Sequence, residues 1–391
     1  MVLLSLFYVY FLMNTRYHFA NFVRCTTLSH SNIFGIVDIG TSTTKFGTRE
    51  YSEPIKTIPT VIGFRPYERY GYYVGRRAVF GGGLLKVVWP VANGQVIDWY
   101  SWEMLITHII SSELGVPPSN CSLFLVEAFN VRMSDRIKKA EILFESIGVK
   151  ELYISDQVIA SLFSSRNITG LVVHSSDSET VVAPIVNGVF VNNGIRKLSI
   201  NGNELTRRLM LILENRGIYF PERIKPLIIR DMKEKMCYVA LDFTSEMDKA
   251  KKNIEEIVVN YELPDGQTIQ LGEVRFRIPE VMFESKGLPD VIVDSLAAID
   301  DAEIASKLVS NIVLSGGNTM FKNFLERLKI ELRQKLPDEL RDKFRINTTE
   351  NRANAPYIGA QIMMKILIQR GTMVTKQQWI DEGINSILKM F

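Results

Sequence analysis

Three short segments, far apart in the chain, share one pattern: a run of apolar β-forming residues that breaks into glycine or hydroxyl residues. They are FGIVDIGTSTTK (residues 34–45), GLVVHSSDSET (170–180) and IVLSGGNTM (312–320). A buried strand followed by a tight turn produces this pattern. In such a turn, successive backbone N–H groups can converge on an anion. The segments therefore predict a phosphate site, with a carboxylate (Asp38) and a cation (Lys45) flanking the first turn.

Further segments point to one protein family. RDMKEKMCYVALDF (230–243) and YELPDGQ (261–267) are similar to segments of actin, and YVG (73–75), FLVEA (124–128) and the terminal Phe391 fit the same pattern. On these residues the chain resembles the actin family, within the wider group that includes sugar kinases and the large heat-shock chaperones. The resemblance runs from about residue 33 to the C-terminus. The three apolar segments above would then be the two phosphate hairpins and the adenosine-binding turn of that group.

The resemblance implies an α/β fold with two similar actin-like (ribonuclease H-like) domains around a nucleotide cleft, each with a smaller subdomain. A single core stops growing at roughly 250–300 residues, so a chain of 391 residues has room for two cores. The expected divisions are an apolar extension at 1–31, a first lobe at 32–165 plus 356–391, a second lobe at 166–355, and small subdomains at about 53–88 and 203–280.

Composition narrows the class of protein. A content of 46% hydrophobic and 23% charged residues is typical of a globular protein, and a net charge of +3 is no basic footprint for nucleic acid. The three cysteines, Cys25, Cys121 and Cys237, have no metal-type spacing. We therefore expect free thiols in a reducing compartment, which is consistent with the cytoplasm.

The apolar segment at residues 2–13 leaves two interpretations open. It is too short to cross a bilayer, which needs about 20 residues, and no positive charge precedes it as in a secretory signal. It either anchors the chain to a membrane surface, or translation starts at Met13 and the segment is never made.

Several segments have helical periodicity. Apolar residues recur at three- and four-residue spacing over 98–110, with Asp98 as the expected N-cap, and the segments 136–144 and 205–213 show the same period. The segment 156–163 is expected to be the helix that runs between the two lobes.

Two carboxylates on matching turns, Asp38 and Asp177, predict a site for hydrated Mg²⁺. Magnesium keeps most of its waters, so nearby carboxylates usually act through them. The alternative for each residue is an Asp that only stabilises its turn. Lys45 is expected on the β-phosphate of ATP as a point charge. The residues expected to contact the phosphates are Gly40, Thr41, Ser42 and Thr43 in the first hairpin and Ser176, Asp177, Ser178 and Glu179 in the second.

The resemblance also assigns residues to the adenine base and the ribose. Arg230, Lys233 and Glu234 share one helix face because they lie at i, i+3 and i+4. Met320 and Phe321 offer soft apolar surface to an adenine, or they only pack in the core. The full set expected around the base and ribose is Gly202, Arg230, Lys233 and Glu234 on one side, and Gly316, Gly317, Asn318, Met320 and Phe321 on the other.

The second hairpin differs from the family pattern at the residues nearest the phosphates. Where the family has DSGDG, this chain has HSSDS, so a carboxylate has become His174 and two glycines have become Ser176 and Ser178. Serine is less free than glycine to adopt positive φ and leaves less room beside a phosphate. The family histidine that helps to order the attacking water corresponds to Val181, which cannot accept or relay a proton.

Gln157, which also orients that water in the family, is retained. Orienting the nucleophile is the main task left to the protein in such phosphoryl transfer. The resemblance thus implies a catalytic set of Gln157, Asp38 and Asp177, and the loss of the histidine predicts slow ATP hydrolysis or none, with binding preserved. Two interpretations of His174 stay open: a surface or turn histidine, or a replacement general base.

As a whole, the resemblance implies an ATP-binding cytoskeletal protein of the cytoplasm that assembles head-to-tail with itself into filaments and meets regulatory actin-binding proteins. Two loops used for assembly in the family are short here, at 67–72 and 284–290. An alternative is therefore an actin-related ATP-binding scaffold subunit of a larger complex. A second alternative is a metabolite kinase of the same superfold, against which the actin-like segments 230–243 and 261–267 argue.

Overall fold

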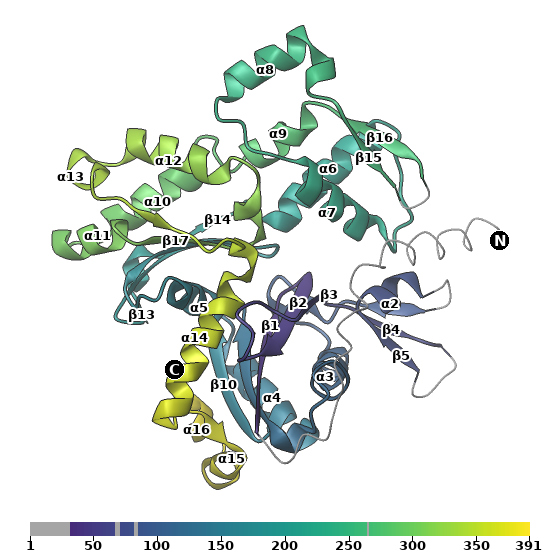
Figure 1. Cartoon of the computed structure of the whole chain (residues 1–391), viewed down its shortest axis with the longest axis vertical. Helices are drawn as coiled ribbons and strands as arrows, with labels where there is room; N and C mark the ends of the chain where they lie inside the picture. The colour runs from purple at the N-terminus through teal and green to yellow at the C-terminus, as the bar shows by residue number, and fades with distance from the viewer. Residues whose placement is uncertain (1–31, 67–70, 82–84, 264–265) are drawn as a thin grey trace.

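A mixed sheet forms the centre of one half of the protein (Figure 1). The computed structural model describes residues 32–66, 71–81, 85–263 and 266–391. β1 runs parallel to β9, and β9 runs parallel to β10, while the outer strands pair antiparallel. In order across the sheet, the strands are β19 (Val374–Thr375), β10 (Glu151–Asp156), β9 (Cys121–Glu127), β1 (Ile33–Ile39), β2 (Thr43–Thr48) and β3 (Lys56–Pro59).

A second sheet repeats this plan in the other half. An antiparallel hairpin, β11–β12, lies beside two strands that run parallel to β11, as β1–β2 lies beside β9 and β10. Its strands are β13 (Val189–Phe190), β12 (Thr180–Val186), β11 (Gly170–Ser175), β17 (Ile312–Ser315) and β18 (Ile346–Asn347), with β14 (Arg196–Leu198) also paired to β12. The two hairpins expected from the sequence at 34–45 and 170–180 are therefore present, one in each sheet.

Two helices lie between the sheets (Figure 1). α5 (Gln157–Ser164) begins at the end of β10 and leads into β11, and it packs against α14 (Ala355–Arg370). The contact is close at Gly359, where an added Cβ would lie 1.6 Å from the carbonyl oxygen of Ala160. Only glycine permits this approach, so the crossing of the two helices is fixed by backbone contact.

Three of the helices around the sheets lie at the segments with helical periodicity in the sequence. Asp98 caps α3 by accepting a hydrogen bond from the Ser101 amide, as expected. The first sheet carries α3 (Trp99–His108), α4 (Met133–Glu141), α15 (Lys376–Glu382) and α16 (Ile384–Leu388). The second half carries α6 (Gly202–Asn215), α7 (Lys225–Met236), α9 (Val274–Glu280), α10 (Leu288–Ala297), α11 (Ala302–Val309), α12 (Phe324–Lys335) and α13 (Asp338–Arg341).

Smaller elements extend from both halves (Figure 1). A three-stranded sheet packs against α2 in the first half, and a two-stranded sheet accompanies α8 in the second. These elements are α2 (Arg76–Phe80), β4 (Ile62–Phe64), β5 (Tyr72–Val74) and β6 (Lys86–Val88), the hairpin of β7 (Val91–Ala92) and β8 (Gln95–Val96), α8 (Phe243–Lys252), β15 (Val259–Glu262) and β16 (Thr268–Leu271).

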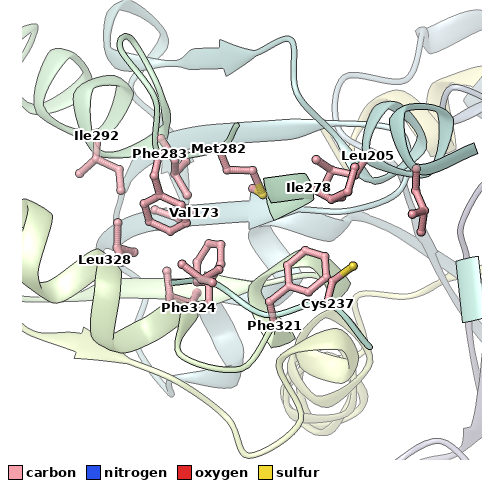
Figure 2. Packing of buried hydrophobic residues seen from close by; sticks show 14 of the residues in the cluster. Val173, Leu205, Cys237, Ile278, Met282, Phe283, Ile292, Phe321, Phe324 and Leu328 are labelled. Atoms are coloured by element: carbon pink, nitrogen blue, oxygen red, sulfur yellow. The ribbon is translucent and has the colours of Figure 1, made fainter. Parts of the chain in front are cut away.

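The core of the second half is built from aromatic and branched side chains that belong to several helices and the sheet (Figure 2). Phe283 and Phe324 meet edge to face with ring centroids 5.3 Å apart, and Val173 of β11 packs in the same cluster. Phe321 also belongs to this cluster and is 6% exposed. The packing of Val173 in this core thus holds β11, the strand that leads into the turn of the second hairpin.

Some expectations fall on residues outside those that the structure describes. They are the apolar segment at 2–13, Cys25 and part of the short loop at 67–72. The two cysteines in the described part, Cys121 and Cys237, are free, as expected, and both are buried. Within the described ranges, the helices are all too short or too polar to cross a membrane.

Candidate functional site

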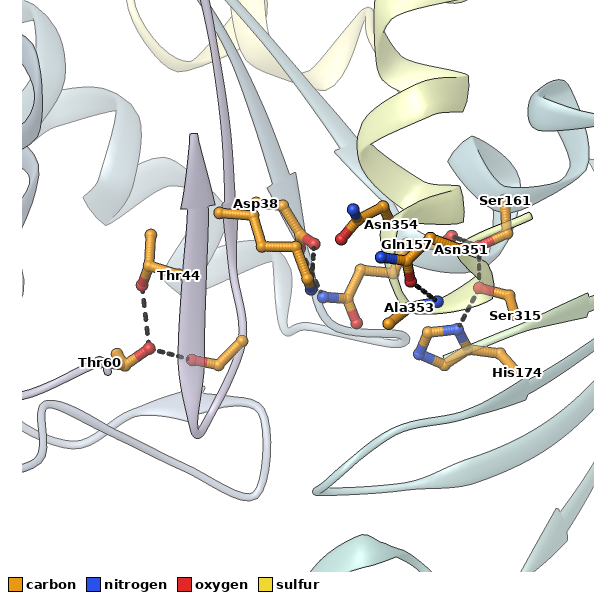
Figure 3. A network of polar contacts seen from close by, with 12 residues as sticks. Asp38, Thr44, Thr60, Gln157, Ser161, His174, Ser315, Asn351, Ala353 and Asn354 are labelled. Carbon is orange, nitrogen blue, oxygen red and sulfur yellow. Dashed lines mark hydrogen bonds and ion pairs between the residues drawn. The ribbon is translucent and has the colours of Figure 1, made fainter. Parts of the chain in front are cut away.

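The first turn joins β1 to β2 and places a buried ion pair beneath it. Asp38 has no exposed surface and faces Lys45 in the strand register, with Lys45 Nζ 3.2 Å from Asp38 Oδ2. Gln157, the first residue of α5, donates from Nε2 to Asp38 Oδ1 at 2.7 Å. Asp38 is therefore held from its own hairpin and from the helix between the sheets (Figure 3).

The turn itself is closed by its own backbone. The Gly40 amide donates to the Thr43 carbonyl at 3.0 Å. The hydroxyl of Thr41 accepts a hydrogen bond from the Gly94 amide at 2.8 Å, which ties the β7–β8 hairpin to the turn. Sequence reasoning missed this contact with Gly94, although an Asn-Gly pair at 93–94 does signal a tight hairpin.

The second turn joins β11 to β12 with the same closure. The Ser176 amide donates to the Glu179 carbonyl at 2.8 Å. Neither Ser176 nor Ser178 has positive φ, so the replacement of glycine by serine imposes no backbone strain here. Asn318 secures the turn from the third segment by donating to the Ser176 carbonyl at 2.7 Å.

The third segment follows β17 and needs its first glycine for packing. Gly316 has φ of 93°, and an added Cβ would lie 2.1 Å from the carbonyl oxygen of Ser175. A Cβ added at Gly317 would have no neighbouring atom within 4 Å. Gly316 therefore permits contact with β11, while Gly317 leaves space on the side of the cavity.

All three segments line one cavity of about 370 Å³. That volume lies in the range of small-molecule sites, about 300–1,000 Å³. Most of the residues predicted from the sequence are brought together here. They are Asp38, Gly40, Thr41, Ser42, Thr43, Lys45, Gln157, Ser176, Asp177, Ser178, Arg230, Lys233, Glu234, Gly316, Gly317, Asn318, Met320 and Phe321.

Two predicted residues do not line the cavity. Glu179 turns its side chain away and accepts a hydrogen bond from the Phe129 amide at 2.9 Å. Gly202 lies behind the second turn, where its amide donates to the Ser176 carbonyl at 2.9 Å. His174 also lines the cavity, as do residues that sequence reasoning did not place among its contacts, namely Thr57, Ala128, Asn351, Asn354 and Pro356.

Arg230, Lys233 and Glu234 share one face of α7 and line the cavity, as their spacing predicted. Arg230 Nη2 lies 3.5 Å from Asp177 Oδ1, so the carboxylate of the second turn is paired from outside its hairpin. Lys233 donates to the Gly202 carbonyl at 2.8 Å, and burial lowers the pKa of Lys233 to about 8. Burial also raises the pKa of Glu234, against the opposing effect of Lys233.

Several buried polar atoms around the cavity have no hydrogen-bond partner within the described residues. They are Nε and Nη1 of Arg230, the hydroxyl of Ser42 and Nε2 of His174. A buried polar group without a partner is costly, and such groups commonly mark a site where a water, ion or ligand binds. The cationic donors of Arg230 and the hydroxyl of Ser42 would suit an anionic ligand that also carries hydroxyl groups. A nucleotide is a ligand of this kind.

The interpretation of His174 as a surface or turn histidine is wrong. His174 lies in β11, is 2% exposed, and its Nδ1 lies 3.0 Å from Ser315 Oγ. Burial lowers its pKa to about 4. The polar sequence around it suggested a turn, but the strand continues through it and the ring packs under the third segment (Figure 3).

Comparison with protein-family models agrees with the fold. The model described as Actin matches residues 31–391. The match covers nearly the whole chain, including both sheets and the three turns that line the cavity. The chain is a member of the actin family.

Proposed function

We propose that this protein binds ATP with Mg²⁺ in the cavity between the two sheets and assembles head-to-tail with itself into cytoplasmic, cytoskeletal filaments. One observation carries the nucleotide proposal: the turns of both sheets open onto a single cavity that is also lined by Arg230, whose Nε and Nη1 donors have no partner among the described residues. Members of the actin family generally bind a nucleotide and a divalent metal ion, so the family supports the same proposal.

The residues present suggest how each part of the ligand would be held. Lys45 and the amides of the first turn would contact the terminal phosphates. Asp38 and Asp177 would hold the magnesium ion through its waters, because Mg²⁺ usually keeps several of its waters in protein sites. The ion would supply charge neutralisation at the phosphates. The α7 face and the third segment would enclose the ribose and the base.

We further propose that hydrolysis is slow. Val181 is fully buried in β12 and offers no hydrogen-bonding group at the position where the family has its water-ordering histidine. Phosphate release by the native chain and by Val181→His tests this point. A native rate equal to that of ordinary actins would contradict it.

Self-assembly is supported by exposed apolar side chains on the last two helices. Ile380 on α15 and Ile384 and Leu388 on α16 are 64%, 48% and 44% exposed. Covering apolar surface contributes about 25 cal/mol per Å², so contact with a second copy of the chain at these side chains would be favourable. A contact that joins this surface to a different surface of the next copy, and does not close on itself, produces a filament.

Sedimentation with ATP and Mg²⁺, followed by imaging of the pellet, tests assembly. We expect filaments, and we expect Leu388→Asp to reduce the pelleted fraction. The control is Ile168→Asp, at a residue that is 51% exposed elsewhere on the surface. A chain that stays monomeric at high concentration in every nucleotide state would refute the filament proposal.

The second candidate, a fixed ATP-binding subunit of a larger complex, is favoured by a specific feature. Only residues 284–287 separate Phe283 from α10, and the Leu288 amide donates back to the Met282 carbonyl at 2.7 Å. This turn is too tight to extend towards a neighbouring subunit, so one family contact for assembly is missing. Persistent monomers that bind ATP would support this candidate.

A further inference from the structure

A chain of buried hydrogen bonds determines which nitrogen of His174 carries its proton. Ser161 Oγ lies 2.6 Å from the carbonyl oxygen of Gln157. A carbonyl cannot donate, so the single hydroxyl proton of Ser161 is used in this bond. Ser161 can therefore only accept in its other contact, with Ser315 Oγ at 2.7 Å.

The same count assigns the next proton. Ser315 must donate to Ser161, so Ser315 Oγ can only accept from His174 Nδ1, 3.0 Å away. Neutral imidazole has one N–H group, which leaves Nε2 of His174 with a free lone pair. Because burial lowers the pKa of His174 to about 4, the ring is neutral at pH 7.

The free nitrogen has no partner in the described part of the protein, although it is buried and its residue lines the cavity. Gln157 lines the same cavity, and its amide nitrogen is used by Asp38 at 2.7 Å. Its Oε1 atom is therefore an acceptor. Figure 3 shows the imidazole between Ser315 on one side and Gln157 with Asp38 on the other.

We propose that His174 Nε2 and Gln157 Oε1 together hold one water molecule, each accepting one of its hydrogens. Both hydrogens are then occupied, so the oxygen lone pairs of the water face the remaining space of the cavity. On the proposed function, that space holds the terminal phosphate of ATP, and the water is the nucleophile. His174 is thus a positioning residue for hydrolysis.

The strand register explains why His174 can do this in place of Val181. The two residues are directly opposite each other in β11 and β12. Directly opposed residues of an antiparallel pair have their side chains on the same face of the sheet. This chain therefore has a histidine on the same face of the second hairpin as the family histidine, but on β11 instead of β12.

The first test reads the imidazole directly by ¹⁵N NMR on histidine-labelled protein, which has only four histidines. The His174 signal is assigned by its loss in His174→Asn. We expect a neutral ring protonated on Nδ1, and loss of that preference in Ser315→Ala. A ring protonated on Nε2, or on both nitrogens at pH 7, would overturn the proposal.

The second test separates binding of ATP from its hydrolysis. In His174→Asn the side-chain amide can still donate to Ser315, but the acceptor facing the cavity is lost. We expect phosphate release in a single turnover to fall by about 10-fold, the factor that corresponds to the loss of one hydrogen bond of about 1.4 kcal/mol in the transition state, with ATP affinity unchanged. His108→Asn, the same change at a histidine outside the cavity, should leave the rate unchanged.

The outcomes distinguish this inference from the function on which it rests. A native chain with no affinity for ATP would refute the proposed function. A chain that binds ATP but releases no phosphate, or that releases it equally fast in His174→Asn, would refute the role of His174 alone.

Discussion

The two hairpins of this protein have the same backbone but opposite side-chain chemistry. Asp38 and His174 each precede the last residue of their strand, and each faces a residue on the partner strand, Lys45 and Val181 respectively. Both turns are closed by a hydrogen bond from the first amide to the fourth carbonyl. The first hairpin thus contains an ion pair where the second contains a neutral ring beside an apolar side chain.

This difference shows that the turn and the charge at its base are specified separately. The turn depends on backbone closure, which serine and glycine both allow. The charge depends on which side chains meet at the hairpin: Lys45 pairs with Asp38 inside the first hairpin, whereas α7 supplies Arg230 to Asp177 of the second. We therefore expect substitutions in the first hairpin to affect ligand binding most and those in the second to affect hydrolysis.

The largest effect should come from breaking the ion pair of the first hairpin. Asp38→Ala leaves Lys45 without its partner and removes a carboxylate proposed to hold hydrated magnesium. Truncating one member of a buried charge pair costs about 2–5 kcal/mol, so we expect ATP affinity in Mg²⁺ to fall by at least about 30-fold. His174→Ala, the equivalent change in the second hairpin, should alter affinity by less than about threefold; equal losses in the two variants would refute the comparison.

A smaller loss of nucleotide affinity is expected when Arg230, the cation that pairs with Asp177 of the second hairpin, is replaced. Arg230→Met keeps much of the side-chain volume but removes the donors that lack partners in the structure. Hydrogen bonds to charged groups contribute about 1.5–3 kcal/mol, so nucleotide affinity should fall about 10- to 100-fold by calorimetry. Arg208→Met, on the neighbouring helix α6 with Glu204 as its partner, is the matched control. If both variants bind equally well, Arg230 has no role at the ligand.

The sequence predicted the parts of this site that depend on short segments. Asp38 and Lys45 lie seven residues apart around one turn, and their pairing follows from the hairpin pattern alone. The burial of His174 was missed because it depends on Ser315, which is 141 residues away. The direction of Glu179 was missed for the same reason, since its partner is the amide of Phe129. Local polarity indicates a turn, but only the packing of distant strands determines which polar side chains enter the cavity.

The junction between the two hairpins should give stability a pH dependence. Asp156, the N-cap of α5, is buried, and desolvation, reinforced by the nearby charge of Glu179, raises its pKa to about 8. Between about pH 4 and 8 the folded state therefore holds a proton that the unfolded state has lost, and the free energy of unfolding falls as pH rises. For one proton the fall is about 1.4 kcal/mol from pH 6 to 7.

Asp156→Asn removes this titration and can still accept the hydrogen bond from Val158. We expect a flatter dependence of chemical denaturation on pH than in the native chain at the same nucleotide concentration. Asp98→Asn, the same change at the N-cap of α3, controls for the loss of a capping charge. A native chain whose stability rises from pH 6 to 7, with the rise abolished in Asp156→Asn, would show that the sign is wrong.

The smallest effect should come from restoring the family glycines in the second turn with Ser176→Gly and Ser178→Gly. Neither serine has positive φ, so glycine relieves no strain and only increases the freedom of the unfolded chain. The double variant should lose about 1–2 kcal/mol of stability, and its ATP affinity should change by less than about threefold. A tenfold gain in affinity would instead mean that the serine side chains crowd the phosphate. In that case the two turns would differ in shape towards the ligand as well as in charge, and the divergence of the second hairpin would have weakened binding directly.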